Sequence, residues 1–61
     1  MNKFFYIYNP HQANFYVMNG IPVLEIGKGK KGDVYVKFPR NEKSLEVFDR
    51  WVKRGNEIEE N

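Results

Sequence analysis

Lysine side chains are the groups in this sequence best suited to bind a ligand. Residues 26–43 contain six bases and two acids, whereas residues 44–61 contain five acids and three bases. The basic segment predicts a site for phosphate groups or for an acidic partner. A solvated loop that keeps the chain soluble and a head-to-tail contact between subunits remain as alternatives. The lysines predicted to bind the ligand are Lys28, Lys30, Lys31 and Lys37.

Tyrosine side chains form a second candidate group. Tyr6, Tyr8 and Tyr35 fall in expected strands, where alternation can place them on one sheet face with Lys37 beside them. Aromatic rings with neighbouring cations can stack a nucleobase and hold its phosphate. Tyrosines equally suit a core or a subunit interface, because they bury area and keep a polar hydroxyl. The residues predicted for an interface are Phe4, Tyr6, Tyr8 and Trp51.

The glycines of residues 27–34 match the pattern GxGxxGxV, and residues 25–35 resemble the glycine-rich hairpin of protein kinases. Glycines let backbone N–H groups approach phosphates. A kinase also needs a lysine on a third strand, a catalytic Asp-Asn loop and a metal-binding Asp, which 61 residues cannot hold. We therefore predict an ordinary hairpin loop, with an anion-binding loop as the alternative.

Catalytic groups are scarce. The chain has no cysteine, which excludes thiol nucleophiles, disulfides and cysteine zinc sites. His11 is the sole histidine and has neither a serine nucleophile nor a carboxylate pair near it in the sequence. We expect no enzyme activity, no cofactor and no metal.

The first strand and helix follow directly from residue types. Residues 4–8 are aromatic or β-branched on both faces, which predicts a strand that needs cover on both sides. Asn9 and Pro10 suit the cap and first position of a helix that runs to about Asn19 and ends at Gly20.

A hairpin is expected next. Residues 21–26 and 34–38 predict two strands joined by the turn chemistry of residues 27–33.

The last element is predicted to be a helix. It should begin between residues 41 and 44 and end near Arg54, with Gly55 as its stop. Its expected inner stripe is Leu45, Phe48 and Val52, flanked by Trp51.

The element order β-α-β-β-α predicts a small α+β domain with a three-stranded sheet and two helices on one face. A right-handed crossover would make the first two strands parallel, with the hairpin adding an antiparallel third strand. Residues 1–55 form the expected domain, and residues 56–61 an acidic, frayed tail. The second sheet face and the edge beside the first strand are left for a partner.

Size and charge narrow the function classes. A chain of 61 residues buries only about 60% of the surface that it exposes when unfolded, which favours a homo-oligomer and above all a dimer. A net charge of +2 disfavours nucleic acid as the partner. No apolar run approaches the roughly 20 residues of a membrane span, so we expect no membrane contact and a cytoplasmic location.

The segments FFYIYNPHQANFYVMNG, IPVLEIG and VYVKF, followed by a Glu/Phe/Trp helix, resemble a family of short uncharacterised proteins. That family is encoded by low-GC Gram-positive bacteria and their phages. It has no defined functional residues to carry over. The resemblance implies the cytoplasm of a bacterial host and a small phage accessory protein that acts by binding, as many counter-defence proteins do.

Three binding functions follow as hypotheses. The first is a homo-oligomer that sequesters an anionic nucleotide-type ligand, such as an immune signalling nucleotide, with the lysines for charge and the tyrosines for stacking. The second is an inhibitor that contacts a host protein through aromatic anchors. The third, disfavoured by the charge, is a regulator that binds nucleic acid.

Overall fold

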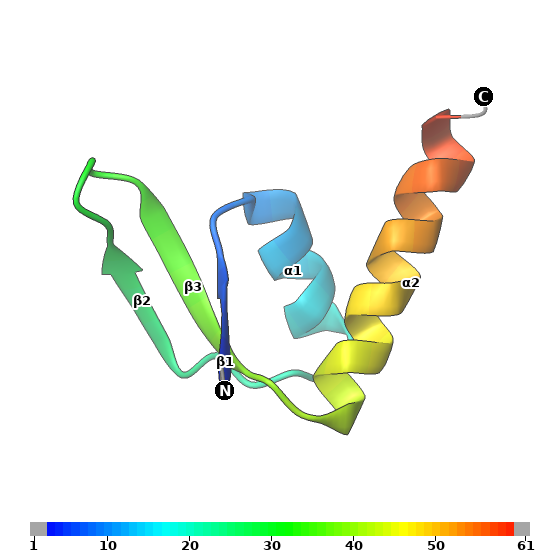
Figure 1. Cartoon of the computed structure of the whole chain (residues 1–61), viewed down its shortest axis with the longest axis horizontal. Coiled ribbons are helices and arrows are strands. Elements are labelled where there is room, and N and C mark those ends of the chain that lie inside the picture. The colour runs from blue at the N-terminus through cyan, green and yellow to red at the C-terminus, as the bar shows by residue number, and fades with distance from the viewer. Residues whose placement is uncertain (1–2, 60–61) are drawn as a thin grey trace.

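The predicted α+β architecture is confirmed in a computed structural model of the chain, which describes the backbone of residues 3–59 and the side chains of residues 3–54. Three strands form one sheet, and both helices lie to one side of it (Figure 1). The elements in chain order are β1 (Phe4–Ile7), α1 (Pro10–Met18), β2 (Glu25–Lys28), β3 (Val34–Pro39) and α2 (Glu42–Glu59).

The sheet has the order β1-β3-β2, and both neighbouring pairs are antiparallel. The first two strands therefore run in the same direction, as expected from the crossover, but β3 lies between them and pairs with each. β3 is the longest of the three strands and carries the fully buried Phe38, which suits it to the centre. Both outer edges, β1 and β2, are free of strand partners among the described residues.

α1 begins and ends where the sequence predicts. The Asn9 side chain accepts hydrogen bonds from the backbone N–H groups of His11 and Gln12, at 2.9 and 3.5 Å, and Pro10 occupies the first turn. At the other end Gly20 has a φ of 84°, a left-handed conformation that favours glycine.

The second strand differs from its expected bounds of residues 21–26. Ile21 is buried in the core, and its N–H donates to the carbonyl of Tyr16 at the end of α1. Regular strand pairing starts only at Glu25, because residues 21–24 form the connection from α1 to the sheet. Pro22 in this connection has no N–H to donate to a neighbouring strand. β2 consequently begins later than predicted and extends to Lys28.

α2 starts with a reciprocal cap. The N–H of Ser44 donates to Oδ1 of Asn41 at 2.9 Å, and the N–H of Asn41 donates to Oγ of Ser44 at 2.8 Å. Its predicted end at Gly55 is wrong, because the helix continues to Glu59. Glycine costs only about 1 kcal/mol in a helix interior, and no proline follows to stop the helix. The predicted tail of residues 56–61 thus overlaps the end of α2, and its side chains lie outside the described residues.

The core lies between the helices and the sheet. The predicted inner stripe of α2 is displaced: Ser44 and Val47 are the buried residues, while Leu45, Phe48 and Val52 remain partly exposed. The cap explains the displacement, because it turns the small Ser44 inward and rotates the apolar stripe toward one side. The buried hydrophobic side chains are Ile7, Ala13, Tyr16, Ile21, Phe38 and Val47.

Candidate functional site: the open face of the sheet

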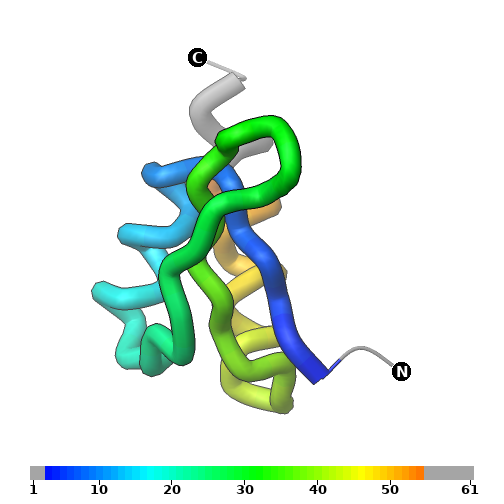
Figure 2. The backbone as a smooth tube through the Cα atoms, turned by 90° about the vertical axis from the view of Figure 1, so that its left-hand side faces the viewer, coloured from blue at the N-terminus to red at the C-terminus, as the bar shows by residue number. Residues whose placement is uncertain are grey.

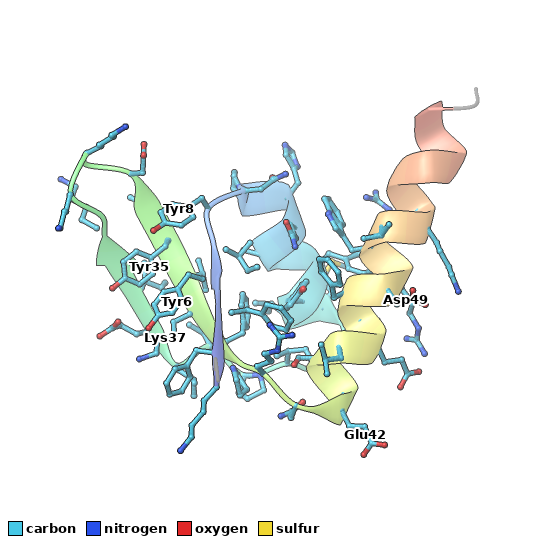
Figure 3. The ribbon with its side chains drawn as sticks, viewed as in Figure 1. Tyr6, Tyr8, Tyr35, Lys37, Glu42 and Asp49 are labelled. Atoms are coloured by element: carbon cyan, nitrogen blue, oxygen red, sulfur yellow. The ribbon has the colours of Figure 1, made fainter. Side chains whose placement is uncertain are left out.

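The strand register places the predicted tyrosines on the sheet face opposite the helices. Tyr6 lies across from Lys37, and Tyr35 lies across from Gly27. Their neighbours Ile7, Val36 and Phe38 point to the helices. Figure 3 shows the tyrosines and Lys37 together on the side away from α2. We call Phe4, Tyr6, Tyr8, Tyr35 and Lys37, with Glu25, the tyrosine face.

The three tyrosine rings contact one another edge to face. The ring centroids of Tyr6 and Tyr35 lie 5.4 Å apart at an interplanar angle of 68°, and those of Tyr8 and Tyr35 lie 5.9 Å apart at 61°. Such pairs hold each other in position. Tyr6 and Tyr8 are nevertheless 50% and 54% exposed. The cluster is therefore ordered and still accessible to a ligand.

Gly27 makes room for this arrangement. A Cβ atom at Gly27 would lie 2.5 Å from Oη and 2.6 Å from Cζ of Tyr35, so the Tyr35 ring covers a position that only glycine leaves open. Gly29 lies beside Tyr8, since a Cβ there would meet the Tyr8 ring at 3.7 Å. Gly27 thus makes room for the Tyr35 ring, whereas an added Cβ at Gly29 would make only an ordinary contact with Tyr8. Packing against Tyr35 accounts for Gly27 without a phosphate-binding loop.

The third glycine shapes the hairpin turn. Gly32 has a φ of 86°, its N–H donates to the carbonyl of Gly29 at 3.0 Å, and the N–H of Gly29 donates to the carbonyl of Asp33 at 2.7 Å. This is the geometry of a three-residue hairpin loop with a left-handed glycine. The predicted hairpin between residues 25–28 and 34–39 is confirmed. An additional role in binding anions stays a prediction.

Lys37 lies over two rings of the tyrosine face. Its Nζ is 4.1 Å from the ring centroid of Phe4 and 5.7 Å from that of Tyr6. A cation held over aromatic faces is stabilised by the ring quadrupoles. The predicted pairing of Lys37 with the tyrosines is therefore present.

Glu25 is a member of this surface that sequence reasoning missed. The Tyr35 hydroxyl donates to Oε1 of Glu25 at 3.1 Å. This hydrogen bond, together with slight desolvation and the negative charge of Glu25, raises the pKa of Tyr35 above its ordinary value of 10.0. The sequence does contain a clue to this contact. A hairpin centred on Lys31 pairs Gly27 with Tyr35 and Glu25 with Lys37, which places all four residues on one face of the sheet.

The remaining predicted lysines are not all on the tyrosine face. Lys28 pairs with Val34, so strand alternation points it to the opposite side of the sheet. Lys30 and Lys31 lie in the turn, next to Gly29, whose backbone approaches Tyr8. The site therefore has Lys37 at the Phe4 end and the lysine turn at the Tyr8 end.

Trp51 is separate from the other predicted interface residues. It is half-buried on α2, with its ring 5.6 Å from that of Phe15 on α1 and 5.5 Å from the Arg54 guanidinium. These residues line an open groove of about 540 Å³ between the helices, with Asn9, His11, Asn14 and Met18. Phe4, Tyr6 and Tyr8 share one surface, and Trp51 belongs to another.

Comparisons of the chain with protein-family models, curated proteins and solved structures find no match. Among the side chains of residues 3–54, no group of three His, Asp or Glu is arranged to hold a metal ion. No helix within residues 3–59 is both long and apolar enough to cross a membrane.

Proposed function

We propose that this chain is a non-enzymatic binding protein that sequesters an anionic nucleotide-type ligand on the tyrosine face of a homo-oligomer. The observation that carries the proposal is a cluster of three tyrosine rings, two half-exposed and packed against the more buried Tyr35, on a sheet face without a helix over it. Aromatic platforms beside cations are how proteins without base-specific contacts hold nucleotides, by stacking and by charge.

The charges around the cluster fit one phosphate-bearing ligand. Lys37 and Glu25 are both within the cluster and balance each other, so the rings themselves sit in a nearly neutral field. Lys30 and Lys31 at the Tyr8 end provide the net positive charge. A base stacked near Tyr8 would place its phosphate toward this turn.

The biological setting of the proposal rests on the sequence resemblance alone. A phage-encoded protein in the cytoplasm of a bacterial host would use such a site to remove a nucleotide signal of host defence. No reaction is needed for this function, only affinity and abundance.

The test is uptake of a nucleotide by the purified protein. Native mass spectrometry of the protein from its bacterial host reports bound mass directly, and thermal unfolding with cyclic di-adenylate added as the probe reports stabilisation. We expect a melting shift that Lys30→Glu/Lys31→Glu removes. The matched control Lys43→Glu/Lys53→Glu makes the same charge change on α2 and should retain the shift. Equal shifts in both double variants would overturn the assignment of the turn.

A second candidate function is direct inhibition of a host protein. Two observations favour it: the Lys37 ammonium is already placed over Phe4 and Tyr6, and the Tyr35 hydroxyl is already bonded to Glu25. Tyrosine and phenylalanine are enriched in protein interfaces, and the two charged groups among these rings already have partners within the chain. This function predicts that one host protein co-purifies with the chain. The Lys30→Glu/Lys31→Glu variant should still bind that protein. The disfavoured third candidate, nucleic-acid binding, predicts affinity that falls steeply with salt.

A further inference from the structure

The free edge of β1 presents a regular row of backbone groups. The N–H of Arg40 donates to the carbonyl of Lys3, and the register pairs Phe5 with Phe38 and Ile7 with Val36. Hydrogen-bonded and non-bonded pairs alternate in an antiparallel ladder. Residues 3, 5 and 7 therefore bond to β3, and the N–H and C=O groups of Phe4, Tyr6 and Tyr8 point outward.

This edge lacks the charged residues and prolines that often block strand addition. Proteins protect edge strands with charges, prolines, bulges or a short strand length, and of these β1 has only the short length. The opposite edge follows this rule, since β2 contains Glu25, Gly27 and Lys28. β1 contains only Phe4, Phe5, Tyr6 and Ile7.

An apolar stripe of α2 continues the same edge on the helix side. Leu45, Phe48 and Val52 are 43%, 40% and 43% exposed and follow one another at helical spacing. The Phe48 ring stacks on Phe5 of β1, with centroids 5.9 Å apart and planes 20° apart. Figure 1 shows α2 on the same side of the sheet as α1, and in Figure 2, turned by 90°, α2 runs behind β1 and β3. The edge and the stripe thus form one surface.

The chain is less compact than a typical monomer of its size. It exposes 4903 Å², whereas a compact monomer of 7.3 kDa is expected to expose about 4,200 Å². A standard protein interface buries roughly 800 Å² on each partner, so the chain has enough exposed surface for one.

We infer that β1 pairs antiparallel with β1 of a second copy of this chain, about a two-fold axis at Tyr6. This register uses all the outward backbone groups, with Tyr6 facing Tyr6 of the second copy and Phe4 facing its Tyr8. No charged residue lies within residues 4–8, so no charged side chains of the two β1 strands face each other directly. The nearest charge on this face is Lys37, which lies one strand away on β3. The two α2 stripes then meet across the same axis.

The dimer would join two tyrosine faces into one continuous surface on a six-stranded sheet. A ligand longer than one nucleotide could then contact both copies. In this respect the inference deepens the proposed function and rests on it, but the dimer itself is tested without any ligand.

Engineered cysteines test the register, because the natural chain has none. Directly opposed Cα atoms of a hydrogen-bonded pair are about 5.5 Å apart, which is within disulfide range. We expect full-length Tyr6→Cys to form a covalent dimer in mild oxidant at low micromolar concentration. The matched control is Ile26→Cys, an exposed position on β2, the other edge strand of the sheet. It should stay mostly uncrosslinked. Equal crosslinking of the two variants, or none in either, would overturn the register.

Sedimentation equilibrium of the wild-type protein and of charge variants tests the dimer itself. Wild type should sediment at twice the chain mass, and Tyr6→Lys should weaken the dimer at least tenfold by opposing two ammonium groups. Val52→Lys places a charge in the α2 stripe and should also weaken the dimer. The control Ile26→Lys, on β2, should leave the dimer unchanged. A wild-type monomer, or a dimer that Ile26→Lys disrupts and Tyr6→Lys does not, contradicts the inference. A monomer that still binds the nucleotide probe would preserve the proposed function, while a dimer that binds none would preserve only the inference.

Discussion

The two faces of the sheet are built from alternating residues of the same strands, yet they have different chemistry. On the covered face Phe5, Ile7 and Phe38 pack with the helices and have no polar side-chain atoms. On the open face the corresponding positions hold Phe4, Tyr6 and Lys37. Neighbouring residues of β1 thus face the core and the candidate binding site in turn. Substitutions on one face can therefore change stability with little effect on the other face.

Two tyrosines show the same contrast. Burial raises the pKa of Tyr16 in the core, opposed in part by the neighbouring Gln12, and its hydroxyl has no hydrogen-bond partner of ordinary geometry among the described residues. Tyr35 on the open face also has a raised pKa, but there the main cause is its bond to Glu25. The pKa shift of Tyr16 thus comes from burial in the core, and that of Tyr35 comes from a contact at the surface.

The largest expected effect comes from removing one aromatic ring on each face. Phe38→Ala should lower the free energy of unfolding by about 3 to 5 kcal/mol, because it opens a cavity beside Tyr16. Tyr35→Ala should cost about 1 kcal/mol or less, since the ring lies at the surface. Urea unfolding of both variants measures the difference. Equal losses would mean that the open face belongs to the core.

A smaller effect is expected from the cap that holds α2 over the covered face. Asn41→Ala should lower the free energy of unfolding by about 1 kcal/mol, because it leaves the N–H of Ser44 without its acceptor. The matched control Asn14→Ala, on the exposed side of α1, should not destabilise the protein. Urea unfolding compares the two, and an Asn41→Ala variant as stable as wild type would contradict the role of the cap.

The covered face also shows which parts of the fold sequence patterns can predict. The β-α-β-β-α order, the Asn9 cap and the shared face of the tyrosines follow from local propensity and strand alternation, and the structure has all three. The burial of Ser44 and the sideways position of Leu45 were not predictable by spacing, because a reciprocal cap decides which side of α2 turns inward.

Pairing between distant strands was equally hard to predict. The position of β3 between β1 and β2 depends on which strand buries most, a tertiary effect. Proximity in the sequence groups Lys28 with the other lysines, yet strand alternation places it on the sheet face opposite Tyr35. Glu25 and Gly27 entered the site only once the hairpin register was known.

A change on the open face alone should move one ring with little effect on stability. Gly27→Ala places a Cβ atom against the Tyr35 ring, which must swing away from β2 and lose its bond to Glu25. We expect the free energy of unfolding to change by about 1 kcal/mol or less, because the ring can move toward solvent. Nuclear Overhauser contacts between the ring and residue 27 should disappear. Gly29→Ala, where the added atom makes only an ordinary contact with Tyr8, is the control and should keep them.

The smallest effect is a change in titration. Glu25→Gln should bring the pKa of Tyr35 down toward 10.0, because the hydrogen bond to a carboxylate and its negative charge are both removed. Because folding raises this pKa, the stabilisation is complete below about pH 10 and is lost as the pH rises through the folded value. Tyrosinate absorbance against pH measures the change. Glu46→Gln, on the solvated side of α2, should leave the curve unaltered.

The open face of the sheet is the proposed binding surface, and chemical-shift mapping by NMR tests this proposal residue by residue. With cyclic di-adenylate added to the wild-type protein, we expect the ring resonances of Tyr6, Tyr8 and Tyr35 and the amide resonances of Lys30 and Lys31 to shift, while those of Phe38 stay in place. Shifts concentrated instead at Trp51 and His11, in the groove between the helices, would contradict it.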